Sequence, residues 1–72
     1  MDYDYILDMV STYDTCIICA KDFVFCGIVL FCDTKNLVLK SHESNIKITL
    51  PVYKVRALRK KGLIRFDFET RL

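Results

Sequence analysis

The spacing of apolar residues changes along the chain and predicts an opening helix followed by strands. Over about residues 3–11, four apolar side chains recur at i, i+3, i+4 and i+7 and so share one helical face. They are Tyr3, Ile6, Leu7 and Val10. Asp2 and Asp4 stand at the start of this stretch, where carboxylates favour a helix N-terminus. We expect a short amphipathic helix here.

From residue 15 onward, β-branched and aromatic residues dominate, and in the stretches Ile46 to Thr49 and Leu63 to Phe68 positions alternate between two faces, which is typical of strands. The pattern predicts five strands: Thr15 to Lys21; Phe23 to Cys32; Leu37 to Lys40; Ile46 to Thr49, bent at Leu50–Pro51 and resumed as Val52 to Leu58; and Leu63 to Phe68. The turns between them are Lys21–Asp22, Asp33 to Asn36, Ser41 to Asn45 and the basic stretch Arg59 to Gly62. A short helix followed by five bent strands favours a mostly β domain, a small closed antiparallel barrel over about residues 15–69.

The second strand, FVFCGIVLFC, is apolar on both faces and contains Gly27. A glycine inside a strand marks a bend, a bulge or a close backbone approach, and we expect Gly27 to let this strand curl. The run spans ten residues, whereas a membrane-crossing helix needs about 20, so no membrane partner is expected.

The chain has 72 residues, of which 53% are hydrophobic, and this length predicts one domain over residues 1–72. A chain so short buries only about 60% of the surface that its unfolded form exposes, so its core is marginal without assistance. The apolar content exceeds what a small monomer hides easily, which favours association with other chains.

Charge is divided unevenly between the two halves. Residues 1–33 hold six Asp and one Lys, a balance of −5, and residues 34–72 hold ten Lys and Arg against three acidic residues, a balance of +7. A basic half on a small domain is typical of nucleic-acid binding, although such a run also occurs as an ordinary solvated face.

The four cysteines are expected as thiols, because the N-terminus lacks the basic region and small-residue cleavage site of a secretory signal and an intracellular protein, cytoplasmic or nuclear, is expected. Cys16 and Cys19 have C-x-x-C spacing, but Cys26 and Cys32 stand singly inside an apolar strand. We interpret all four as small buried hydrophobes, with zinc or redox chemistry as alternatives, and expect no metal and no cofactor.

The second turn and its flanks form a pattern: Gly27, Val29, the pair Cys32–Asp33, Asn36 and the run Leu37–Val38–Leu39. With the expected order of elements, this pattern resembles the first signature of the Sm/Lsm family and its bacterial relative Hfq. That signature runs from a glycine in strand two to an apolar–Asp pair, a loop ending in Asn, and an apolar run. The loop Asp33 to Asn36 is one residue shorter than the family's, and its aromatic or His platform is absent.

The family's second signature, an apolar–Arg–Gly turn between strands four and five, has three competing matches: Val55-Arg56-Ala57, Leu58-Arg59-Lys60 and Lys61-Gly62. The stretch LIRFDF is similar to the fifth strand of Sm proteins of the D type, and VYK to the end of strand four in Hfq. The resemblance covers residues 16–69.

The resemblance implies an RNA-binding subunit of a ring of six or seven barrels, identical or different, that contacts single-stranded, U-rich RNA through the turns after strands two and four. Asn36 would read a base and Asp33 would hold the loop. The other candidate RNA-binding residues are Thr34, Lys35, Arg56, Arg59, Lys60 and Lys61. Without the aromatic platform, binding would lose a stacking contribution of about 1 to 3 kcal/mol per base.

In this family, strand four of one subunit pairs with strand five of the next. The resemblance therefore implies apolar residues at or near that interface, namely Ile46, Ile48, Val52, Ile64 and Phe66.

Two other classes remain open: an Sm-like barrel that serves protein assembly only, with a degenerate RNA site, and an unrelated small β-barrel adaptor. No enzyme is expected. His42 is the only histidine and lies in a polar loop, and the chain has no Gly-rich phosphate loop.

Overall fold

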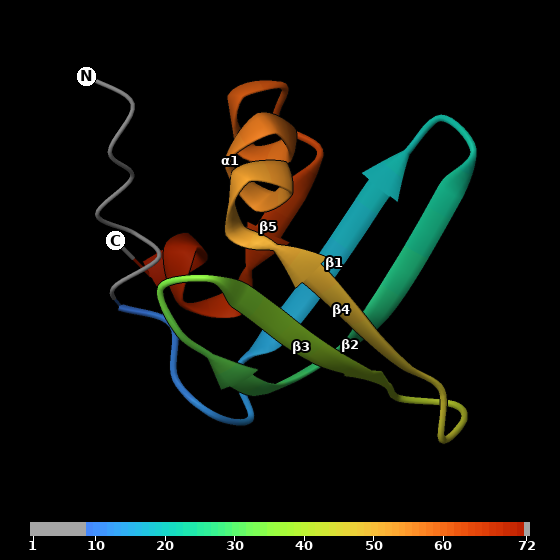
Figure 1. The fold of residues 1–72 in the computed structure, drawn as a ribbon. Helices are drawn as coiled ribbons and strands as arrows, with labels where there is room; N and C mark the ends of the chain where they lie inside the picture. The colour runs from blue at the N-terminus through green and yellow to red at the C-terminus, as the bar shows by residue number, and fades with distance from the viewer. Residues whose placement is uncertain (1–8, 72) are drawn as a thin grey trace.

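The protein is described by a computed structural model that covers residues 9–71, with side chains described through Glu69. These residues form a five-stranded antiparallel sheet with one α-helix packed against it (Figure 1). The elements are β1 (Thr15–Ala20), β2 (Phe23–Cys32), β3 (Asn36–Ser41), β4 (Lys47–Pro51), α1 (Val52–Lys60), β5 (Ile64–Phe66) and a closing 3-10 helix, η2 (Asp67–Arg71). The prediction of a mostly β domain is confirmed.

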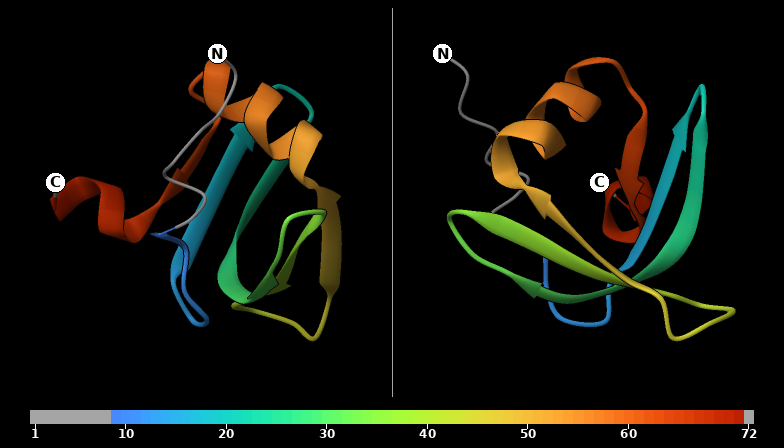
Figure 2. Two further views of the ribbon diagram at one scale, coloured as in Figure 1. Left: turned by 60° about the vertical axis from the view of Figure 1, so that its left-hand side comes forward. Right: turned by 45° about the vertical axis from the view of Figure 1, so that its right-hand side comes forward.

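The strand order is β4-β3-β2-β1-β5. Strands β1, β2 and β3 form a meander in which each strand pairs with the next, β4 pairs with β3 at its edge, and α1 then returns the chain so that β5 pairs antiparallel with β1. The sheet curls, and α1 lies over its concave side (Figure 2). The predicted barrel closure is wrong: β4 and β5 are the two edges of an open sheet.

Strand β2 matches the prediction in extent, but Gly27 acts differently from the bend that we expected. The register of β2 against β3 shifts between Val29 and Phe31, two residues beyond the glycine. At Gly27 itself, a Cβ atom would meet the carbonyl oxygen of Lys40 and the ring of Phe25. Gly27 is therefore required by the close approach of β3, and the irregularity of the strand is a separate bulge.

The core lies between the concave face of the sheet and α1. Its buried members come from all the strands except β4 and from the helix: Cys16, Ile18, Phe25, Val29, Leu37, Leu39, Val55, Ile64 and Phe66. Alternation along β5 is as predicted, since Ile64 and Phe66 are buried and Arg65 between them is exposed.

The placement of the helix corrects the sequence interpretation. The helix expected over about residues 3–11 lies mostly outside the described residues, and within residues 9–71 the α-helix follows β4 instead of opening the chain. The stretch Val52 to Leu58, predicted as a resumed strand, is the first seven residues of α1. Buried Val52 and Val55 recur at helical spacing, and the rest of the segment contains good helix formers such as Lys, Arg, Ala and Leu.

The stretch Arg59 to Gly62, predicted as a turn, is the C-terminal end of this helix. The N–H of Gly62 donates to the carbonyl oxygen of Arg59 at 3.0 Å, and the N–H of Leu63 donates to that of Leu58 at 2.9 Å. These two bonds form a Schellman motif, and Gly62 supplies the left-handed residue that it needs, with φ of 70°. Glycine takes this conformation without a steric penalty, so it fixes where α1 ends.

None of the helices in the described part of the chain is long and apolar enough to cross a membrane.

Candidate nucleic-acid interface

The turn between β2 and β3 is held by the carboxylate of Asp33. Its Oδ1 accepts hydrogen bonds from the backbone N–H of Asn36 at 2.7 Å and of Lys35 at 2.8 Å. These bonds favour the charged form and lower the pKa of Asp33, with the bond from Asn36 as the larger cause. The turn is therefore preorganised, with Thr34 and Lys35 exposed at its tip and Asn36 half-buried as the first residue of β3.

This turn lies beside the start of α1. The N–H of Val52 donates to the carbonyl oxygen of Lys35 at 2.8 Å, and Asn36 pairs with Pro51 in the sheet. The structure thus brings together the two regions, the turn after strand two and the basic segment after strand four, that hold the candidate RNA-binding residues. They meet through backbone contacts at the N-terminal end of the helix.

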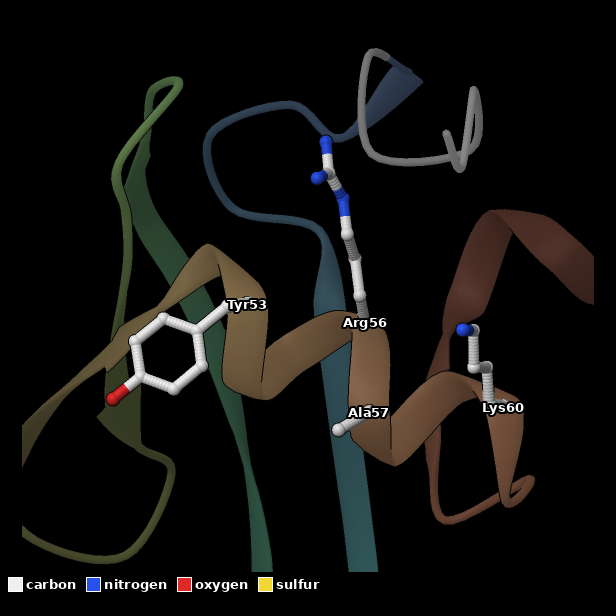
Figure 3. A pocket seen from close by; sticks show the side chains of 4 residues that line it. All are labelled: Tyr53, Arg56, Ala57 and Lys60. Carbon is white, nitrogen blue, oxygen red and sulfur yellow. The ribbon is translucent and has the colours of Figure 1, made fainter. Parts of the chain in front are cut away.

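Helix α1 carries four basic residues and no acidic one in its nine positions. On one of its exposed sides, four residues line a hollow of about 290 Å³: Tyr53, Arg56, Ala57 and Lys60. Figure 3 shows Ala57 as the short side chain between the ring of Tyr53 and the chain of Lys60, with Arg56 beside it. The side chain of Tyr53 is 76% exposed, so its ring offers an open stacking face.

Arg56 is half-buried and extends away from the helix toward the segment that precedes β1 (Figure 3). Its Nε is buried and makes no hydrogen bond within residues 9–71. A buried donor without a partner is costly, and because this atom is buried, an acceptor from outside reaches it only when the Arg56 side chain moves.

The other basic candidates have different surroundings. Arg59 makes an ion pair with Glu69, Nη1 to Oε1 at 2.7 Å, and both side chains are largely shielded, at 15% and 23% exposed. Glu69 Oε1 also accepts from the N–H of Phe66 at 2.9 Å, so Arg59 helps to tie α1 to β5 and η2. Lys61 caps the helix and lies on another side of it, away from Tyr53.

Tyr53 was not among the residues predicted for RNA contact. Its signal is the spacing of Tyr53, Arg56, Ala57 and Lys60 at i, i+3, i+4 and i+7, which puts an aromatic ring and two basic residues on one helical face. That signal is visible only when residues 52–60 are recognised as a helix.

The apolar residues expected at a ring interface divide into two groups. Val52, Ile64 and Phe66 are buried in the core of the domain itself, whereas Ile46 is 63% exposed and Ile48 is half-buried.

The edges of the sheet differ as pairing surfaces. Alternation of the antiparallel ladder leaves the backbone N–H and C=O groups of Lys47 and Thr49 pointing outward from β4, because Ile46 bonds to Ser41 on the inner side. On β5, the same alternation points the N–H of Phe66 outward, where the carboxylate of Glu69 accepts it. Within residues 9–71, the edge at β4 is open over most of its length, and the edge at β5 is short and partly occupied.

The cysteines are all free thiols, as expected, but their burial is not uniform. Cys16 is buried, and burial raises the pKa of its thiol to about 12. Cys19 and Cys26 are exposed on the convex face of the sheet, so the prediction that they are buried is wrong. No cluster of three or more potential metal ligands occurs among residues 9–71.

His42 lies in a polar loop, and the hollow that it lines, about 440 Å³, also includes Cys26 and Glu43. The His42 backbone N–H donates to the Cys26 carbonyl oxygen at 3.2 Å. This bond joins the two main chains and does not bring the imidazole of His42 to a nucleophilic side chain. That the chain is not an enzyme stays a prediction.

No family model, curated protein or solved structure matches this chain in the comparisons. Fold and surface define a small β-rich domain with a basic helix laid over an open sheet.

Proposed function

We propose that this domain binds single-stranded RNA on the surface formed by the β2–β3 turn and the Tyr53 side of α1. The observation that carries this proposal is the exposed ring of Tyr53 in one hollow with Arg56 and Lys60, on a helix whose first residue, Val52, is hydrogen-bonded to the preorganised turn. Single-stranded nucleic acid is bound where an aromatic platform for a base lies next to cations for the backbone. The role is the one that the resemblance to the Sm/Lsm family implies, and Tyr53 supplies an aromatic platform that the shortened turn lacks.

Each group has a distinct task in this proposal. The ring of Tyr53 stacks on an unpaired base, and the guanidinium of Arg56 donates to a phosphate or to a base edge. Lys60 and Lys35 contribute sequence-independent attraction for the backbone. Asn36, whose amide has donors and an acceptor, is the candidate for reading a base edge, and Asp33 acts by holding the turn.

The test is fluorescence anisotropy with a labelled oligo-U at about 50 mM salt, where backbone contacts are strong. Tyr53→Ala should weaken binding by roughly fivefold to a hundredfold, the equivalent of one lost stacking contact of about 1 to 3 kcal/mol, whereas Tyr53→Phe should retain affinity. Lys60→Ala should lower the slope of log affinity against log salt by about 0.7. Lys47→Ala on the convex face of the sheet removes the same charge and is the matched control.

If Lys47→Ala and Lys60→Ala weaken oligo-U binding equally, the binding is due to general charge attraction and the assigned surface is refuted. Absence of binding at low salt, with the domain folded, would refute RNA binding altogether.

A second candidate, protein assembly, is favoured by the convex face of the sheet. Three large apolar side chains stand exposed there, Ile17 at 47%, Val24 at 75% and Phe31 at 53%. Ile17 and Val24 lie close together on the paired strands β1 and β2, and Phe31 lies toward the other end of β2. Apolar side chains gathered on an exposed face are typical of protein interaction sites. The oligomeric mass in solution, measured with and without oligo-U, separates the candidates: assembly without any RNA affinity supports the second, and an RNA-binding monomer supports the first without the ring.

A further inference from the structure

A second hollow lies on a different side of α1, between the helix and the β1–β2 hairpin. It has a volume of about 420 Å³, which falls within the range of small-molecule sites. In Figure 1, α1 and the end of the β1–β2 hairpin, which supply most of its lining, extend toward the same end of the domain. Because the barrel does not close, the concave side of the sheet stays accessible here.

The interior of this hollow is apolar. Ile18 of β1 is fully buried beneath it, and Leu58 of α1 and Leu63, which follows the helix, are half-buried along its wall. Phe23 at the start of β2 also lines it and keeps 44% of its surface exposed. The hollow thus presents aliphatic and aromatic surface that the fold leaves incompletely covered.

Its rim is basic. Lys54 and Lys61 come from α1, and Lys21 comes from the turn of the hairpin, so cations flank the opening from both sides. All three are exposed, and none makes an ion pair with another residue in the part of the chain that the structure describes. Asp22 is the acidic residue of the lining, which leaves a positive balance at the mouth.

The backbone around the hollow favours a ligand without main-chain hydrogen-bonding groups. β1 is paired on one side with β2 and on the other with β5, and its ladder groups are therefore occupied. An extended peptide placed against it would have buried N–H and C=O groups without partners, which is costly. An alkyl chain has no such groups and gains from every methylene removed from water.

We propose that this hollow binds a free single-chain amphipathic anion, a fatty acid or an alkyl phosphate, with the tail against Phe23, Leu58 and Leu63 and the anionic head between Lys21, Lys54 and Lys61. The site is separate from the surface proposed for RNA: Lys54, Leu58 and Lys61 recur at i, i+4 and i+7 on one helical face, and Tyr53, Arg56 and Lys60 on the adjacent one.

The experiment uses the full chain and a dansyl-labelled undecanoic acid, whose fluorescence rises in apolar surroundings, with dodecanoate as competitor below its micelle concentration. Saturable binding displaced by dodecanoate is expected, with dodecyltrimethylammonium, which has the same tail and the opposite charge, at least tenfold weaker. Hexanoate should also be at least tenfold weaker, because it buries half of the tail. Equal competition by the anionic and cationic detergents, or no displacement by dodecanoate, would overturn the proposal.

Variants locate the site. Lys54→Gln/Lys61→Gln should weaken dodecanoate at least tenfold, and Lys40→Gln/Lys47→Gln, which removes the same charge from a cross-strand pair on the other face of the sheet, should change it less than twofold. Ala20→Leu, which adds volume at a lining position, should weaken binding tenfold with the melting temperature retained. Equal effects of the two double variants would overturn the assignment, and so would binding confined to vesicles of phosphatidylcholine and phosphatidylserine.

Discussion

The meander of β1, β2 and β3 and the segment β4–α1–β5 are stabilised in different ways. In the meander, strands that follow each other in the sequence pair with each other, through short turns. In the second segment, β5 pairs with the distant β1, and α1 has its place only because Val55 enters a core made by other elements. The pairing of the first region is short-range in the sequence, whereas α1 and β5 of the second depend on contacts with elements distant in the sequence.

The two regions also differ in how many core residues and how many proposed ligand-binding residues they hold. The meander supplies most of the buried core together with Lys21, Lys35 and Asn36, and the second segment carries the basic helix, which holds the other groups proposed to bind ligands on two of its sides. A helix held mainly by one buried face can present its remaining faces to partners, which a fully paired central strand cannot do with its backbone. Both proposed functions therefore depend on α1, whose position is set by contacts with residues distant in the sequence.

The largest expected effect is in the meander. Gly27→Ala should destabilise the domain by at least about 3 kcal/mol, because the new Cβ meets the backbone oxygen of Lys40, which no side-chain rotation relieves. Urea denaturation followed by circular dichroism measures this. The matched change in the second region, Gly62→Ala, meets no neighbouring atom within 4 Å and should cost only about 1 kcal/mol, for its left-handed conformation. Equal costs would show that the crowding at Gly27 is not real.

The next effect tests whether the two regions unfold together. Val55→Ala removes two methyl groups from a side chain that is fully buried and should cost about 2 kcal/mol. Amide hydrogen exchange should show protection lost first in α1 and β5, with β2 and β3 retaining more of theirs. A uniform loss of protection over all amides would mean that the domain unfolds as one cooperative unit. The two regions would then not differ in stability.

A smaller effect is expected at the link between α1 and β5. Glu69→Gln keeps an oxygen that can accept from Phe66 but removes the charge that pairs with Arg59, and it should cost about 1 kcal/mol. Glu43→Gln, in an exposed loop, removes the same charge without a described ion pair and serves as the control. A denaturation midpoint that shifts equally in both variants would contradict a specific role for Glu69.

The smallest effect concerns the turn of the meander. Because the pKa of Asp33 is lowered in the folded state, its contribution to stability is complete above the unfolded value of about 3.9 and is lost as the pH falls through the folded pKa. The amide signals of Asn36 and Lys35 should follow this titration by NMR, with a midpoint below 3.9. Asp33→Asn should abolish the response. A midpoint at or above the unfolded value would contradict the hydrogen-bonded turn.

The sequence predicted the meander more accurately than the segment β4–α1–β5. Strand β2 was predicted at its observed bounds, because a strand in a hairpin is determined by its own period and by the turns beside it. Residues 52–60 were misassigned because Val52, Tyr53 and Val55 have the composition of a strand, and tertiary packing overrides such propensities. Gly62 just after a basic last turn was the available signal for a helix end.

The candidate site was predicted in part. The turn at Asp33 to Asn36 was recognised from residue types that form turns locally. Its position beside α1 could not be inferred, because it depends on where the helix lies. For the same reason Arg59 was grouped with the ligand-binding residues, although its guanidinium is paired with Glu69.

The contact of Glu69 with the N–H of Phe66 has a consequence for symmetry. Among the described strands, it leaves β4 as the one edge whose outward groups are open over most of the strand. Two identical edges can pair only about a two-fold axis, and the resulting dimer has no such edge left to recruit a third copy. If copies of this domain associate through their sheets, the carboxylate of Glu69 therefore sets the number at which that association stops.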